Sequence, residues 1–86
     1  MDNKEISFRE KLDKQHHFPG PYLFKFIVPK NQKELVTQFL PDGKTRFKES
    51  SNGKYVSVTV DAFMESSDKV IDVYKRVATV EGVISL

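Results

Sequence analysis

Apolar and polar residues alternate most regularly along residues 54–63, which predicts a strand with one buried side and one solvent-facing side. The buried side would carry Val56, Val58, Val60 and Ala62, and the solvent side Tyr55, Ser57, Thr59 and Asp61. Residues 44–49 alternate in the same way and predict a half-exposed strand. Because Asn52 and Gly53 both tolerate positive φ, the pair between these runs predicts a β-hairpin with a type I′ turn.

Two further runs have strand character. Residues 22–28 are aromatic and branched, with Tyr22, Phe24, Phe26 and Val28 facing one way and Leu23, Lys25 and Ile27 the other. Both sides are largely apolar, which is typical of a central strand. Gly82 interrupts the next apolar run, and residues 83–86 are predicted to form a last edge strand.

Two segments between these strands have the helical period. The first combines Leu35, Val36, Phe39 and Leu40 in one apolar stripe, with Asn31 as the expected N-cap and Glu34 three residues later. The second follows Ser66 or Ser67 as its cap, and its apolar stripe contains Val70, Ile71, Val73, Tyr74, Val77 and Ala78. The first helix is predicted to be short, about two to three turns, whereas the apolar stripe of the second is long enough to cover a sheet.

The first seventeen residues are mostly polar, and we expect them to lie outside the folded domain. Ser7 and Glu10 fit a capping box, and Phe8 and Leu12 are spaced i, i+4, so the segment is either a short, loosely docked helix or a disordered tail. The Phe-Pro-Gly-Pro run at residues 18–21 stops any helix. The sequence therefore predicts a tail or short helix over 1–17 and one domain over 18–86.

The order strand, helix, strand, strand, helix, strand predicts an α+β, ferredoxin-like βαββαβ sandwich. Its four-stranded antiparallel sheet would have the order 4-1-3-2, with two helices on one face and the other face open. Leu23 and Ile27 would lie on this open face beside seven candidate binding residues, which are Lys25, Lys44, Arg46, Lys48, Ser57, Thr59 and Asp61. Since a lysine midway along a central strand needs a partner or open water, we expect a cross-strand pair between Lys25 and Asp61.

The 86-residue length allows one core, and the composition excludes several kinds of site. The chain has no cysteine, which excludes disulfides, thiolate metal sites and cysteine nucleophiles and favours a reducing compartment. It also has no run that resembles a signal peptide or a membrane span, so we expect a cytoplasmic protein. Adjacent His16 and His17 would point apart as a solvated pair, and we expect no metal and no cofactor.

The formal net charge of +2 is too small to indicate nucleic-acid binding, but the charge is uneven along the chain. Residues 43–60 contain four basic residues and the single acidic residue Glu49. Lysines on an edge strand commonly prevent edge-to-edge association, and the same side chains could bind an anion. Both interpretations of Lys44, Arg46 and Lys48 stay open.

Two functions that other ferredoxin-like proteins perform find no support in these residues. The first loop, residues 28–31, lacks the arginine and the glycines with which acylphosphatases hold a phosphate. RNA-binding domains of this fold stack bases on aromatic side chains at the centre of the open face, where this chain has Lys25, Ser57 and Thr59. The sequence therefore predicts no catalytic set and argues against sequence-specific RNA binding.

The runs HFPGPYLFKFIVP at 17–29 and SNGKYVSVTVDA at 51–62, followed by a helix and a short terminal strand, resemble the YbeD-like family of small uncharacterised bacterial proteins. The resemblance covers residues 17–86. Lys25, Gly53 and Tyr55 look like family positions, whereas Pro29 lies near a position that often carries glycine. The resemblance implies a ferredoxin-like fold related to ACT regulatory domains, a bacterial cytoplasmic setting and no established activity.

These observations favour a non-enzymatic regulatory or protein-interaction module that resembles ACT-like domains. Its partner would be another protein or a second copy of the chain, with no membrane involved. The alternative is weak binding of nucleic acid or another anionic ligand through the basic edge strand and the open sheet face. Such binding would weaken steeply as the salt concentration rises.

Overall fold

The computed structural model describes residues 3–50 and 52–86 of the chain. The elements in chain order are α1 (Asn3–Gln15), β1 (Gly20–Pro29), the 3-10 helix η1 (Lys30–Gln32), α2 (Lys33–Gln38), β2 (Lys44–Glu49), β3 (Tyr55–Met64), α3 (Ser67–Val77) and β4 (Ile84–Ser85). From β1 onward this is the predicted βαββαβ order. The α+β, ferredoxin-like fold is therefore confirmed.

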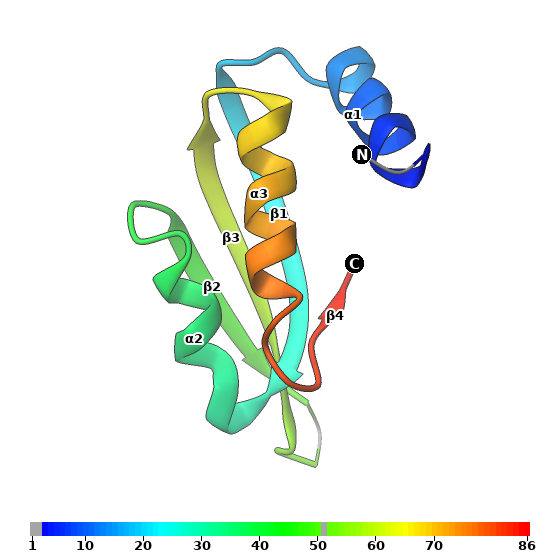
Figure 1. The fold of residues 1–86 in the computed structure, drawn as a ribbon. Coiled ribbons are helices and arrows are strands. Elements are labelled where there is room, and N and C mark those ends of the chain that lie inside the picture. The colour runs from blue at the N-terminus through cyan, green and yellow to red at the C-terminus, as the bar shows by residue number, and fades with distance from the viewer. Residues whose placement is uncertain (1–2, 51) are drawn as a thin grey trace.

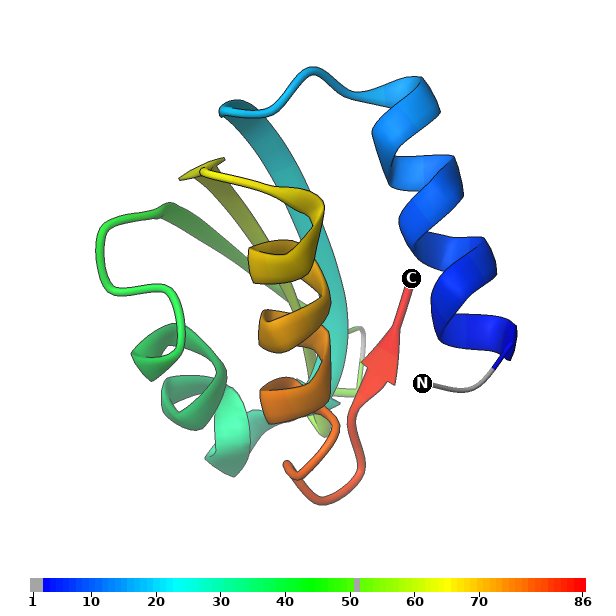
Figure 2. The same cartoon turned by 45° about the horizontal axis from the view of Figure 1, so that its top comes forward.

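The four strands form one antiparallel sheet in the order β2-β3-β1-β4, which is the predicted order read from the other edge. β1 and β3 pair along their whole length, from Gly20 opposite Met64 to Pro29 opposite Tyr55. Figures 1 and 2 show α2 and α3 over the same face of this sheet, whereas α1 lies near its β4 edge. No helix of the described residues covers the opposite face.

The core lies between the sheet and the helices. Every second residue of the two central strands faces the core, as the alternation predicts, and all of these are buried except the half-buried Tyr22. The largest fully buried side chains are Phe24, Phe26, Val28, Val36, Val56, Val58, Val60, Val70 and Val77. Ser66 caps α3 as expected, since its hydroxyl oxygen accepts a hydrogen bond from the Lys69 amide.

The N-terminal segment is a helix that packs on α3. Leu12 is only 3% exposed, and the Phe8 ring meets the Tyr74 ring edge-on at 5.4 Å between centroids. Ion pairs join Arg9 to Asp68 and Glu5 to Lys75. α1 begins at Asn3, so the predicted capping box at Ser7 is wrong, because contacts with α3 hold the chain in helical form upstream of that position.

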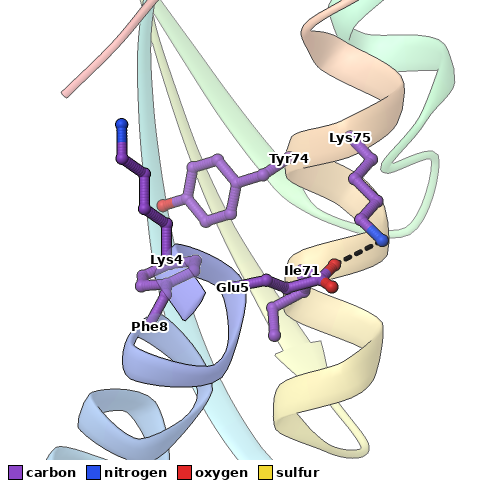
Figure 3. Close-up of a pocket in the computed structure, with 6 residues that line it drawn as sticks. All are labelled: Lys4, Glu5, Phe8, Ile71, Tyr74 and Lys75. Atoms are coloured by element: carbon purple, nitrogen blue, oxygen red, sulfur yellow. Dashed lines mark ion pairs between the residues drawn. The ribbon is translucent and has the colours of Figure 1, made fainter. Parts of the chain in front are cut away.

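A groove of about 400 Å³ lies between α1 and α3. Phe8, Ile71 and Tyr74 supply its apolar wall, and Figure 3 shows the ion pair between Glu5 and Lys75 across it. The Tyr74 hydroxyl shares a 3.1 Å hydrogen bond with the Tyr22 hydroxyl on β1. Burial, and then this hydrogen bond, raise the pKa of the Tyr74 phenol well above its ordinary value.

The connection after β1 differs from the prediction. Residues Lys30–Gln32 form a 3-10 turn, and α2 starts only at Lys33 without a side-chain cap, so Asn31 is not the N-cap. The Lys30 amide donates to the Lys54 carbonyl at 3.0 Å, which ties the chain to the neighbouring hairpin and forces a tight turn at this point. Val36 and Leu40 are buried as expected, whereas Leu35 is 42% exposed.

The β2–β3 hairpin is confirmed, but its turn type is not. Gly53 has a φ of +72°, and no non-glycine residue in the described part of the chain has positive φ, so Asn52 cannot occupy a type I′ position. The Asn52 side-chain oxygen instead accepts hydrogen bonds from the Ser50 hydroxyl at 2.8 Å and the Lys54 amide at 3.1 Å. Asn52 therefore shapes the loop through its side chain.

The last strand is shorter than predicted and depends on a close backbone approach. Gly82 has a φ of +79°, and a Cβ atom there would lie 2.8 Å from Cγ of Pro29. This packing returns the chain to β1, where Ile84 pairs with Ile27 and Ser85 with Phe26. The predicted edge strand at 83–86 is thus confirmed as the two-residue strand β4.

The facing of β1 and β3 can be tested with two phenylalanines. Because Phe26 is fully buried and Phe63 is 71% exposed, we expect Phe26→Ala to lower the free energy of unfolding by about 3–5 kcal/mol and Phe63→Ala to change it by less than about 0.5 kcal/mol. Urea unfolding followed by circular dichroism measures both values. Similar losses for the two variants would contradict the assigned faces.

The environment of Tyr74 predicts a pH dependence above the ordinary phenol pKa. The folded protein holds the Tyr74 proton to higher pH than the unfolded chain does, so this group contributes stability that is lost as pH rises above about 10. We expect wild type to lose more free energy of unfolding between pH 8 and pH 11 than Tyr74→Phe loses. Tyr55→Phe keeps Tyr74 and serves as the control that should behave as wild type. Equal losses in all three proteins would refute this role of Tyr74.

Candidate interaction surface

The register of the sheet places all seven candidate residues on the face without helices. Lys25 lies directly opposite Thr59, which lies opposite Arg46 on its other side. The adjacent rows are Ile27, Ser57 and Lys48 on one side and Leu23, Asp61 and Lys44 on the other. Cross-strand partners share a face of the sheet, so the structure brings these side chains together on one surface. Their role in binding stays a prediction.

We define this open face as the seven candidates, Leu23 and Ile27, together with four residues that were not counted on the predicted face, although the alternation had placed Tyr55 on the solvent side of its strand. Tyr55 and Phe63 occupy the two ends of β3, and Ile84 and Leu86 belong to the β4 edge, where the Leu86 amide donates to the Lys25 carbonyl at 3.0 Å. The alternation along β3 is sufficient to place Phe63 on this face, since it continues the series Tyr55, Ser57, Thr59 and Asp61. The two C-terminal residues could not be found in this way, because their place depends on the β1–β4 register.

The open face exposes much apolar surface. Phe63 is 71% exposed, Leu86 66%, Ile84 53%, Leu23 46% and Tyr55 44%. At the Tyr55 end the surface is hollowed by about 210 Å³, lined by Ile27, Lys48, Glu49, Ser50, Tyr55 and Ser57. Exposed apolar side chains gathered on one surface, rather than scattered singly, are typical of interaction sites.

The cations of the open face have no anionic partner within the described ranges. The ion pairs of the described residues lie elsewhere and join Arg9 to Asp68, Lys30 to Glu49, Lys75 to Glu5 and Arg76 to Asp72. Lys25, Lys44, Arg46 and Lys48 take part in none of these pairs, and Asp61 has the single acidic side chain among the open-face residues. The side chains of the open face therefore carry a net positive charge.

The expected pair between Lys25 and Asp61 is absent from the described residues. Asp61 lies opposite Leu23 on β1 and opposite Lys44 on β2, one row away from Lys25. The core pairs Phe24 with Val60 and Phe26 with Val58, and this packing fixes the register that separates the two charges. The prediction was therefore right about the face and wrong about the partner.

Glu49 adds a fixed negative charge at the rim of the hollow. Its carboxylate lies 2.9 Å from the Lys30 Nζ, and the hydrogen bond and charge of Lys30 lower the pKa of Glu49. Because Lys30 already engages this carboxylate, the neighbouring Lys48 ammonium stays available for an external anion.

The adjacent histidines do not behave as a solvated pair. The His16 ring lies 5.0 Å from the Tyr22 ring and 6.0 Å from the Phe18 ring, between centroids, whereas His17 is exposed. The solvated-pair interpretation is wrong for His16, because α1 docks close enough to bring its C-terminal end onto β1. Across residues 3–50 and 52–86, no group of three or more histidine, cysteine or acidic side chains is placed to hold a metal ion.

None of the helices in the described part of the chain combines the length and apolar character that crossing a membrane requires.

Comparisons with known proteins place the chain in a family. A family model described as "Protein of unknown function (DUF493)" matches residues 13–86. UPF0250 proteins of Haemophilus influenzae strains PittEE, PittGG and Rd are each 32% identical over 84 residues, which covers 85% of this chain and 87% of each relative. No solved structure matches the chain. The protein belongs to the DUF493 family, the YbeD-like family of small bacterial proteins that its strand and hairpin motifs resemble.

Proposed function

We propose that this chain is a non-enzymatic interaction module that binds another protein through its open sheet face. The observation that carries the proposal is the meeting of exposed apolar side chains and unpaired cations on one surface. Apolar contact area supplies most of the affinity of protein interfaces, and charged groups at the rim add specificity and association rate. The open face offers both.

Charge on the open face favours a partner that is a different protein. Two copies stacked through this surface would bring Lys25, Lys44, Arg46 and Lys48 of each copy together, with one Asp61 on each side. Like charges at close range destabilise an interface. An acidic partner surface would instead neutralise these cations, so we assign the partner acidic side chains beside apolar ones.

The proposal assigns no catalysis to the open face. An activated nucleophile needs a base within hydrogen-bond reach, and no hydrogen bond joins two open-face side chains in the described part of the chain. The cytoplasmic location and the regulatory role that the ACT-like resemblance implies are further parts of the proposal. The absence of cysteine and the bacterial relatives support the first, and binding to an enzyme would support the second.

The alternative is binding of nucleic acid through β2, which the three cations at every second position favour. Two features oppose it. The centre of the open face carries small Ser57 and Thr59, and the aromatic Tyr55 and Phe63 lie eight residues apart on β3, about 27 Å along a strand. Neighbouring bases cannot stack on two rings at that separation.

A charge reversal on the open face tests the proposed function. We expect Lys25→Glu combined with Arg46→Glu to abolish retention of a specific protein from a bacterial lysate, while the melting temperature changes little because both side chains are exposed. The control combines Lys11→Glu with Lys69→Glu, which makes the same charge change on exposed helical positions and should retain the partner. The measurement is a pull-down at low and moderate salt, with retained protein and nucleic acid both identified.

Two results would contradict the proposal. Equal retention of the same protein by wild type and the open-face variant would show that binding occurs elsewhere. Recovery of mixed nucleic acid that is released by moderate salt, with no specific protein, would support the anion-binding alternative.

A further inference from the structure

Between Tyr55 and Phe63, small side chains on β3 lie between longer ones on the two neighbouring strands, and we call this part of the open face the trough. Its floor consists of the small side chains of Ser57 and Thr59. On one side β2 carries Lys44, Arg46 and Lys48, and on the other side β1 and β4 carry Leu23, Ile27, Ile84 and Leu86 around Lys25. One wall is therefore cationic and the other is mainly aliphatic.

The width of the trough matches an α helix. Neighbouring strands lie about 4.8 Å apart, so the backbones of β1 and β2, which carry the two walls, are separated by about 10 Å. An α helix with its side chains is about 10–12 Å across. A helix that lies along β3 would therefore contact both walls and the floor between them.

The spacing along the trough also matches a helix. Side chains on one face of a strand repeat about every 6.8 Å, and helical residues i and i+4 are about 6 Å apart. Carboxylates at i, i+4 and i+8 of a helix would thus lie near Lys48, Arg46 and Lys44 in turn. A single extended strand presents only one line of side chains toward the sheet, so it could not reach two walls about 10 Å apart.

The hollow at the Tyr55 end supplies an anchor position. Its volume of about 210 Å³ is below the ~300 Å³ lower bound of pockets for drug-sized ligands, which favours one inserted side chain over a whole small molecule. Ile27 and Tyr55 line it and Lys48 lies at its edge. An apolar side chain followed by an acidic one would use both features, as anchor residues do at interface hot spots.

We propose that the open face binds an amphipathic α helix of another protein, which lies along β3 with an acidic stripe on β2 and an apolar stripe on β1 and β4. This inference rests on the proposed function and names the partner. The chain's own α3 does not fit the description, because its apolar stripe is buried in the core and its Asp68 and Asp72 are already paired with Arg9 and Arg76.

A photo-cross-linking residue on the trough floor tests the inference. p-Benzoylphenylalanine replaces Thr59 in one variant and exposed Gln38 of α2 in the control variant, and each full-length chain is irradiated in a bacterial lysate. Mass spectrometry then identifies the cross-linked segment. We expect only the Thr59 variant to capture a segment with apolar residues at i, i+3 or i+4 and i+7, flanked by acidic residues at a spacing of four.

A synthetic peptide of the captured segment gives the second readout. We expect it to gain helical circular dichroism on binding the wild-type chain and to bind at least roughly tenfold more weakly to Lys44→Glu with Lys48→Glu. The control pair, Lys11→Glu with Lys69→Glu, should leave its affinity unchanged.

The outcomes separate this inference from the proposed function. Capture of an extended or basic protein segment at Thr59 would overturn the helical partner and leave the open face as a protein-binding surface. Capture of nucleic acid or of a second copy of the chain, capture at Gln38 alone, or no capture at either position would overturn both.

Discussion

The antiparallel pairing of β1 with β3 determines both faces of the molecule. Ten consecutive residue pairs keep Phe24, Phe26 and Val28 on the same side as the valines of β3, where the helices cover them. A shift of one residue would turn those side chains to solvent and bury polar ones, so packing of the core selects a single register. That same register aligns Lys25 with Thr59 and Arg46 in the middle of the uncovered face.

The cations of β2 have a structural explanation that does not extend to Lys25. β2 is an edge strand, and lysines there hinder pairing with the edge of another molecule. β1 lies between β3 and β4, so its lysine is not needed to block pairing with another molecule. Lys25 nevertheless lies among Leu23, Ile27 and Leu86, and none of the described residues forms an ion pair with it. Lys25 is exposed, so water can solvate its ammonium group in the free protein, and the proposed partner would bring a carboxylate to it.

Sequence patterns were sufficient for the strand order, the facing of the core strands and the cap at Ser66, because each depends on local periodicity or local hydrogen bonding. They failed where a distant contact decides the outcome. Asn31 lost its capping role because the Lys30 amide bonds to Lys54, and the Lys25–Asp61 pair failed because register is a property of two strands. The docking of α1 likewise depends on residues of α3 about 60 to 70 positions away. The site prediction shared this limit: alternation identified the seven candidate residues with Leu23 and Ile27, but the β4 edge needed the structure.

Binding through the open face is tested most directly by NMR spectroscopy, which shows residue by residue where components of a bacterial lysate contact the chain. Amide resonances of the ¹⁵N-labelled chain would be compared in buffer and in a concentrated bacterial lysate depleted of nucleic acid. We expect broadening or shifts concentrated at Lys25, Arg46, Ser57 and Thr59, with little change along the exposed positions of α2 and α3. Changes concentrated on the helices, or a spectrum with no local perturbation, would contradict the claim that the open sheet face is where this protein acts.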